Sequence, residues 1–178
     1  VADQYAAAGY VAIAPALFDR VEKGLELGYG QEDFGKGRDT RMALKNDGIL
    51  ADVQAAINEA ASAGKVGVVG YCFGGAVSWM AATSCNGVAA ASCYYGGGIH
   101  ASKDATPKCP VQYHFGDKDG GIPLNQVAEI KEAQPDIPCF VYDDAGHGFC
   151  CDDRESYNAG ACGRARERTL SLFGEHVG

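Results

Sequence analysis

The sequence predicts an α/β fold in which helices cover both faces of a mostly parallel sheet. Short apolar stretches alternate with segments of helical pattern along the chain. These stretches are continuous apolar runs, which is typical of parallel strands buried on both faces. No repeat, linker or second region of distinct composition divides the 178 residues, so we expect one domain over residues 1–178.

The first third of the chain is expected to contain one strand and one long helix. Residues 1–8 have the pattern of a helix end, and the apolar run at 11–15 predicts a strand. The polar, glycine-rich stretch at 19–41 predicts a loop. Apolar residues then recur at helical spacing over about 47–63, where Gly64 ends the pattern, so this segment predicts the clearest helix of the chain.

The rest of the chain alternates between the two kinds of element. Each predicted strand is an apolar run bounded by glycine, proline or polar residues, and each predicted helix follows a turn. In chain order we expect a strand at 66–71, a helix at 74–84, strands at 88–95 and 110–116, a helix at 123–133, a strand at 138–142 and a helix from about 157 to 173.

A nucleophile elbow is predicted directly after the strand at 66–71, where the sequence reads Gly-Tyr-Cys-Phe-Gly-Gly. Such a turn strains the backbone of its central residue, Cys72, and needs small residues two positions away, where Gly70 and Gly74 stand. The helix that follows directs its positive end at the thiol and favours the thiolate. The backbone N–H of Phe73 is then a candidate oxyanion donor. The alternative is a glycine-rich turn around an inert, buried cysteine.

Two later segments supply partners for the thiol in the α/β-hydrolase order of nucleophile, acid and histidine. Asp117 and Asp119 follow the strand at 110–116, and acids at the carboxyl end of a parallel strand lie where α/β folds carry out chemistry. His147 stands between two glycines after the strand at 138–142, which predicts a loop that reaches the thiol. The other histidines lack such a setting and are expected to be structural or solvated: His100, His114 and His176.

Together these segments resemble the dienelactone hydrolase (carboxymethylenebutenolidase) family. The similarity rests on the elbow at 70–75, Gly-Asp-Lys-Asp at 116–119, Ala-Gly-His-Gly-Phe at 145–149 and Glu-Arg-Thr-Leu at 167–170. It begins with the segment at 8–18 and covers essentially the whole chain. It is specific because serine, and not cysteine, is the rule at the elbow of this fold.

The resemblance implies roles for the candidate residues. Cys72 would be the nucleophile, His147 the base and Asp119 the acid that orients His147. Asp119 matches the family position because it lies four residues before Pro123. Asp117 is the fallback acid, and its alternative role is to cap a turn.

The implied reaction is hydrolysis of a lactone or an activated carboxylic ester through a thioester on Cys72, with no metal and no organic cofactor. Family substrates carry a carboxylate that two arginines bind. Cys151 stands at one of these positions, and Arg154 follows it closely, while the other arginine comes from the region after the strand at 11–15. The resulting candidates for substrate binding are Arg38, Arg41, Arg154, Tyr95 and Phe149. For each arginine the alternative is a solvated surface charge, and for the aromatic residues it is ordinary core packing.

The resemblance also predicts that something is missing before residue 1. Family members carry further strands there, with a loop that holds a glutamate and a second oxyanion donor. We therefore expect a fragment of a longer protein, a shift of the strand at 11–15 toward that at 66–71, or a second chain in the gap, as in a homodimer through an open sheet edge. The missing segment favours one alternative function, a catalytically impaired relic that binds a ligand or partner. A separate alternative is a thiol-redox protein that uses Cys72 and a resolving cysteine.

Composition argues against several other classes of protein. The net charge of −8 provides no electrostatic footprint for nucleic acid. No stretch approaches the ~20 apolar residues that a membrane span needs, and we expect a cytoplasmic protein without a leader. The eight cysteines include no Cys-x-x-Cys spacing and are expected to be free thiols in a reducing compartment. The alternative is a metal or redox site built from Cys150, Cys151 and Cys162.

Overall fold

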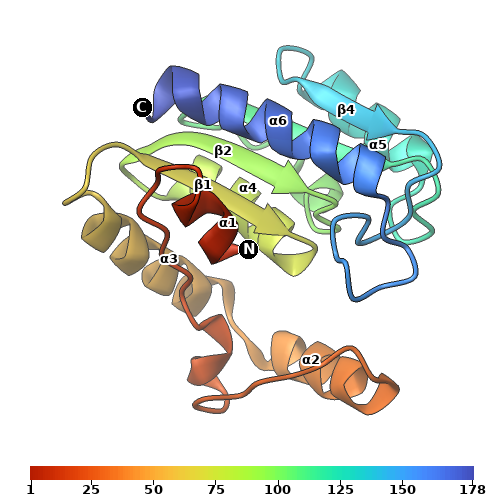
Figure 1. Cartoon of the computed structure of the whole chain (residues 1–178), viewed down its shortest axis with the longest axis horizontal. Coiled ribbons are helices and arrows are strands. Elements are labelled where there is room, and N and C mark those ends of the chain that lie inside the picture. Colours follow the sequence, from red (N-terminus) through yellow and green to blue (C-terminus); the bar gives the residue numbers. More distant parts are fainter. The chain divides into compact units, whose positions relative to one another are not determined.

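The computed structural model describes residues 1–178, which form two compact units, 1–63 and 64–178 (Figure 1). The expectation of one domain therefore stays a prediction. The regular elements of the first unit are all helices: α1 (Ala2–Ala6), the 3₁₀ helix η1 (Leu17–Arg20), α2 (Gln31–Ala43) and α3 (Asn46–Ala60). None of the helices in the chain combines the length and the apolar character that crossing a membrane requires.

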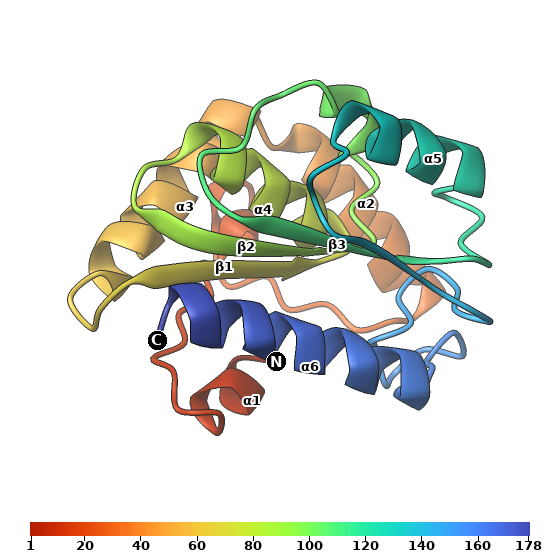
Figure 2. The same cartoon turned by 90° about the horizontal axis from the view of Figure 1, so that it is seen from above.

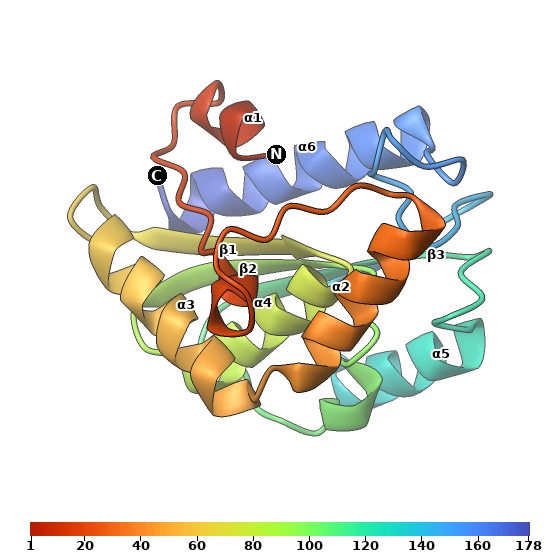
Figure 3. The same cartoon turned by 90° about the horizontal axis from the view of Figure 1, so that it is seen from below.

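Two expectations for the first unit are wrong. Residues 11–15 form no strand, because no neighbouring strand pairs with this apolar run. The stretch at 19–41 is not a loop throughout, since η1 and much of α2 lie within it, and Figure 3 shows α2 followed directly by α3. Glu32 and Asp33 lie in the first turn of α2 and Arg41 lies in its last turn. Acidic side chains at the start of a helix and basic ones at its end interact favourably with the helix dipole.

The second unit contains one parallel sheet with the strand order β1-β2-β3-β4, which confirms the predicted fold class. Figure 2 shows α4 and α5 on one face of this sheet and α6 on the other. Every predicted element appears within a few residues of its expected bounds: β1 (Val66–Tyr71), α4 (Phe73–Ser84), β2 (Val88–Tyr94), β3 (Val111–Gly116), α5 (Leu124–Ala133), β4 (Cys139–Tyr142) and α6 (Ala159–His176), with the short 3₁₀ helix η2 (His100–Ser102) after β2.

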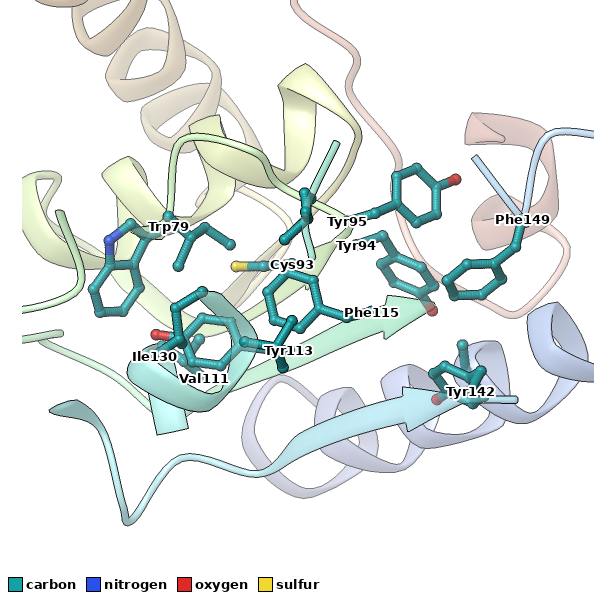
Figure 4. Packing of buried hydrophobic residues seen from close by; sticks show 14 of the residues in the cluster. Trp79, Cys93, Tyr94, Tyr95, Val111, Tyr113, Phe115, Ile130, Tyr142 and Phe149 are labelled. Atoms are coloured by element: carbon teal, nitrogen blue, oxygen red, sulfur yellow. The ribbon is translucent and has the colours of Figure 1, made fainter. Parts of the chain in front are cut away.

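Aromatic side chains fill much of the core of this unit (Figure 4). Trp79 of α4 meets the ring of Tyr113 edge-on, with 5.6 Å between the ring centroids. Tyr95 follows the end of β2 and packs against Phe149, with 5.1 Å between centroids. Because Phe149 lies two residues after His147, this packing anchors the histidine loop to the sheet.

A buried hydrogen-bond network joins the sheet to α6. His114 of β3 lies 3.1 Å from the Ser92 hydroxyl through Nε2 and 2.8 Å from the Tyr142 hydroxyl through Nδ1. The Thr169 hydroxyl of α6 lies 2.8 Å from that of Ser92 and 2.6 Å from that of Tyr94. These bonds satisfy polar groups that would otherwise be costly to bury, and His114 is structural, as expected.

We expect His114 to make the protein progressively less stable in acid. Burial first, and then the nearby positive charge of Arg168, lower the pKa of His114 to about 3 from an ordinary value of 6.5. Between these two values the unfolded chain binds a proton that the folded chain does not bind. The free energy of unfolding should therefore fall by about 1.4 kcal/mol for each pH unit below about 6.5.

Urea unfolding between pH 7 and pH 4 measures this effect. The variant His114→Gln lacks the titrating group, so the slope that His114 contributes is the difference between the two proteins. The variant is expected to be less stable at pH 7 but to lose less stability in acid. If the free energy of unfolding fell equally with pH in both proteins, protonation of His114 would not be what destabilises the folded state.

Candidate active site

The predicted elbow holds Cys72 in a backbone conformation that residues other than glycine rarely adopt, with φ 54° and ψ −116°. The turn is tight because β1 passes directly into α4. A Cβ atom on Gly70 would lie 2.0 Å from the carbonyl oxygen of Gly74, and one on Gly75 would lie 2.2 Å from that of Tyr94. A Cβ atom on Gly74 would meet nothing within 4 Å. The steric need for glycine therefore falls on residues 70 and 75, which corrects the expectation for Gly74.

The structure brings three of the predicted residues into one hydrogen-bonded chain. His147 Nε2 lies 3.0 Å from Cys72 Sγ, and His147 Nδ1 lies 2.7 Å from Asp119 Oδ2. The other carboxylate oxygen, Asp119 Oδ1, accepts bonds from the backbone N–H groups of Gly121 (2.8 Å) and Ile122 (3.1 Å). The three side chains follow β1, β3 and β4, whose carboxyl ends meet at one edge of the sheet.

Asp117 does not reach His147. Its Oδ1 accepts a bond from the backbone N–H of Ala145 at 3.3 Å, and its Oδ2 lies 3.4 Å from the Lys118 ammonium. This contact ties the turn after β3 to the loop that leads to His147, which is the structural role that the sequence left open for this residue.

Electrostatics favour a charged thiolate–imidazolium pair. Burial alone would raise the pKa of Cys72, but the hydrogen bond and charge of His147, the Phe73 backbone N–H and the charge of Arg154 together lower it. The hydrogen bonds of His147 to Asp119 and Cys72, opposed by burial, raise the pKa of His147 to about 9. Burial likewise opposes the fall in the pKa of Asp119 that its hydrogen bond to His147 causes. These shifts favour the thiolate form of Cys72, whose sulfur is exposed.

Two buried aromatic residues, Tyr95 and Phe149, support the His147 ring. Tyr95 is 2% exposed and meets the His147 ring edge-on, with 5.3 Å between centroids. Its φ of 35° turns the chain sharply after β2. Phe149 is 0% exposed and packs against Tyr95. Contact of these two rings with a substrate stays a prediction.

The three candidate arginines have different surroundings. Arg154 is half-buried and lies beside Gly148, where an added Cβ atom would come within 3.1 Å of its Cδ and Nη1 atoms. Its charge acts on the Cys72 thiol. Arg38 and Arg41 lie on α2 in the first unit, where Arg38 pairs with Asp39 at 3.4 Å. Their part in binding a substrate stays a prediction.

The expectation that all eight cysteines are free thiols is wrong, because Cys150 and Cys162 form a disulfide. It links the segment after His147 to the first turn of α6, and 12 positions separate the two residues in the sequence. Their spacing alone gave no pairing, since only the fold brings the start of α6 back beside this segment. A metal site built from Cys150, Cys151 and Cys162 would lack two of its three thiolate ligands, because the disulfide uses them.

Comparison with known proteins places this arrangement among hydrolases. Residues 1–177 match the model of a family described as the dienelactone hydrolase family. A candidate carboxymethylenebutenolidase from Synechocystis sp. is 35% identical and is aligned over 97% of this chain and 78% of its own. The carboxymethylenebutenolidase of Pseudomonas putida is 33% identical, over 93% and 74%. A crystal structure of a candidate dienelactone hydrolase from Klebsiella pneumoniae superposes with a TM-score of 0.83 at 25% identity, over 97% of this chain and 78% of that one.

Proposed function

Because this chain belongs to the dienelactone hydrolase family and is a carboxylic ester hydrolase, we propose that it cleaves a lactone or an activated ester of a small molecule through a thioester on Cys72. The observation that carries the proposal is the hydrogen-bonded chain from Asp119 through His147 to the exposed sulfur of Cys72. No step in this reaction calls for a metal or an organic cofactor.

In the first half of the reaction the Cys72 thiolate attacks the ester carbonyl carbon. The strained elbow supports this step because it holds the sulfur clear of its own strand. The Phe73 backbone N–H, which already points toward the sulfur, is the proposed donor to the oxyanion that forms beside it. The leaving oxygen takes a proton from the His147 imidazolium, and a thioester remains on Cys72.

In the second half of the reaction water replaces the sulfur. His147, now neutral, removes a proton from the water molecule, which attacks the thioester carbonyl and releases the carboxylic acid. The hydrogen bond that Nδ1–H donates to Asp119 keeps Nε2 free to act as this base, and it stabilises the imidazolium that results. A thiol suits enol esters and other good leaving groups, because with an amide the sulfur would leave before the nitrogen.

A carboxylate on the substrate is the proposed specificity element. Arg154 supports this because its guanidinium lies beside the histidine loop and its charge acts on the nucleophile. A carboxylate bound there would stay within reach of the elbow and gain a charge-assisted hydrogen bond.

Replacing Cys72 with alanine tests the proposed reaction. Release of p-nitrophenol from p-nitrophenyl acetate should fall by about four powers of ten, because the variant has no atom to carry the acyl group. The matched control Cys109→Ala removes a thiol away from the site and should keep activity within about twofold. Acid quenching during turnover should trap an acetyl group on Cys72 that mass spectrometry locates.

The competing functions give different results in the same assay. Turnover that is absent in the unaltered protein would point to a relic that binds without catalysis. A disulfide at Cys72, found by mass spectrometry in place of an acyl group, would point to a thiol-redox protein. Turnover that survives in Cys72→Ala would place the nucleophile elsewhere and contradict the proposal.

We also propose a homodimer through the open edge of the sheet. β1 pairs with β2 on one side only, and no other strand pairs with it. An edge strand of this kind favours pairing with another chain. Sedimentation analysis at micromolar concentrations should show a dimer, and a monomer at all concentrations would contradict this part of the proposal.

A further inference from the structure

We propose that Cys150 and Cys162 are positioning residues: their disulfide holds Arg154 beside the nucleophile, so that reduction weakens the binding of anionic substrates. This inference rests on the proposed function, because it assigns Arg154 a carboxylate to bind. It concerns the segment from Cys150 to Cys162, here called the clasp loop, which begins three residues after His147 and ends in the first turn of α6.

Three backbone hydrogen bonds close local turns within the clasp loop. The N–H of Cys151 donates to the Gly148 carbonyl at 2.8 Å, and the N–H of Arg154 donates to the Cys151 carbonyl at 3.1 Å. That of Tyr157 donates to the Arg154 carbonyl at 3.0 Å. Such bonds close one turn each and compete with water, so by themselves they leave the loop many conformations.

A disulfide and longer-range hydrogen bonds tie the clasp loop to the rest of the second unit. The disulfide brings the Cα atoms of Cys150 and Cys162 to 4.9 Å. The Ser156 hydroxyl donates to the His147 carbonyl at 2.7 Å, and the Asn158 side-chain amide donates to the Asp144 carbonyl at 3.2 Å. Of these contacts only the disulfide is a covalent closure, and cross-linking a loop removes the more open conformations available to it.

Arg154 has competing partners within its own loop. Three exposed acidic residues flank it in the sequence: Asp152, Asp153 and Glu155. The Arg154 guanidinium lies against Gly148, the residue after His147, and its charge acts on Cys72. A loosened loop would let Arg154 move away from Gly148, which would weaken its attraction for a substrate carboxylate held near Cys72.

The catalytic group has support of its own that does not depend on the disulfide. Phe149 is fully buried and packs against Tyr95, whose ring in turn meets His147. Asp119 holds the other side of the His147 ring. Opening the disulfide should therefore affect the binding of a charged substrate more than the chemistry of a neutral one.

The redox step itself is simple thiol–disulfide exchange. Reduction breaks the single bond between the two sulfur atoms and takes up two electrons and two protons. A dithiol reductant supplies them and closes its own disulfide in the process. Both cysteines are half-buried, so part of each side chain is open to solvent.

The test compares a neutral ester, p-nitrophenyl acetate, with an anionic one, the mono-p-nitrophenyl ester of succinic acid, before and after reduction with tris(2-carboxyethyl)phosphine. A phosphine is used because a thiol reductant would itself attack the thioester. A thiol titration must show two additional free thiols after reduction. KM for the anionic ester should then rise about tenfold, while kcat/KM for the neutral ester stays within about twofold.

Variants separate this effect from loss of structure. The double variant Cys150→Ser/Cys162→Ser should behave like the reduced protein and should not respond to the phosphine, while Cys109→Ser should respond as the unaltered protein does. Arg154→Gln should have the raised KM in both redox states. An unchanged KM after verified reduction, or an equal loss with both esters, would overturn the inference. Failure of the proposed function would look different, since neither ester would then be hydrolysed in either redox state.

Discussion

Replacing Asp119 with asparagine is expected to lower kcat for an activated ester by about a thousandfold while leaving the fold intact. The physical reason is the orientation of the new amide. Oδ1 of Asp119 accepts two backbone bonds, from Gly121 and Ile122, whereas Oδ2 accepts one, from His147. The amide oxygen of the introduced asparagine should keep the two backbone donors, which turns its NH₂ group toward His147.

An NH₂ group facing Nδ1 forces the wrong tautomer of His147. Nδ1 then has to accept a hydrogen bond, so the proton of the neutral ring moves to Nε2, which faces Cys72. The ring can no longer accept the proton of the thiol or of the attacking water. The substitution also removes the carboxylate that raises the pKa of His147. The alkaline limb of the pH profile, expected near pH 9, should therefore move to lower pH.

The matched control is Asp117→Asn, two residues away on the same turn. Asp117 bonds to the backbone of Ala145 and not to His147, and an asparagine oxygen can accept the same bond. Its kcat should stay within about threefold of the unaltered enzyme. Steady-state kinetics on p-nitrophenyl acetate decide the matter, and a larger loss in Asp117→Asn than in Asp119→Asn would show that Asp117 is the acid.

Replacing Gly70 with alanine is expected to be among the most destabilising single changes in the chain. The added methyl carbon would stand 2.0 Å from the carbonyl oxygen of Gly74 and 2.6 Å from the Ser78 hydroxyl oxygen. Because the first of these is a backbone atom, no rotamer change relieves the overlap, and β1 and α4 must move apart. The free energy of unfolding should fall by about 3 kcal/mol or more, which corresponds to a fall in Tm of about 10 °C.

The neighbouring change Gly74→Ala provides the control. A methyl carbon there meets nothing within 4 Å, and the residue lies in the first turn of α4, where alanine favours a helix. Its Tm should be equal to or slightly above that of the unaltered protein in differential scanning calorimetry. If Gly70→Ala and Gly74→Ala lost similar stability, the close approach of β1 to α4 would not be the reason that glycine is needed at residue 70.

Much of the second unit was predictable because its signals are local. A continuous apolar run between turn residues predicts a buried strand wherever it occurs, and all four such runs from residue 66 onward lie in the sheet. The run at 11–15 has the same signal but forms no strand. A strand exists only with a neighbour, and the sequence of a segment does not show whether that neighbour is present.

The sequence by itself determined the elbow, the order of Cys72, Asp119 and His147 along the chain, and the strands that present them, since these follow from spacing and apolar pattern. Only the tertiary structure decided that Gly75 and not Gly74 needs to be glycine, and that Cys150 pairs with Cys162. Each of these depends on how segments far apart in the chain approach one another, to within an ångström or two. Such distances are set by the packing of the whole sheet and its helices, which no local pattern encodes.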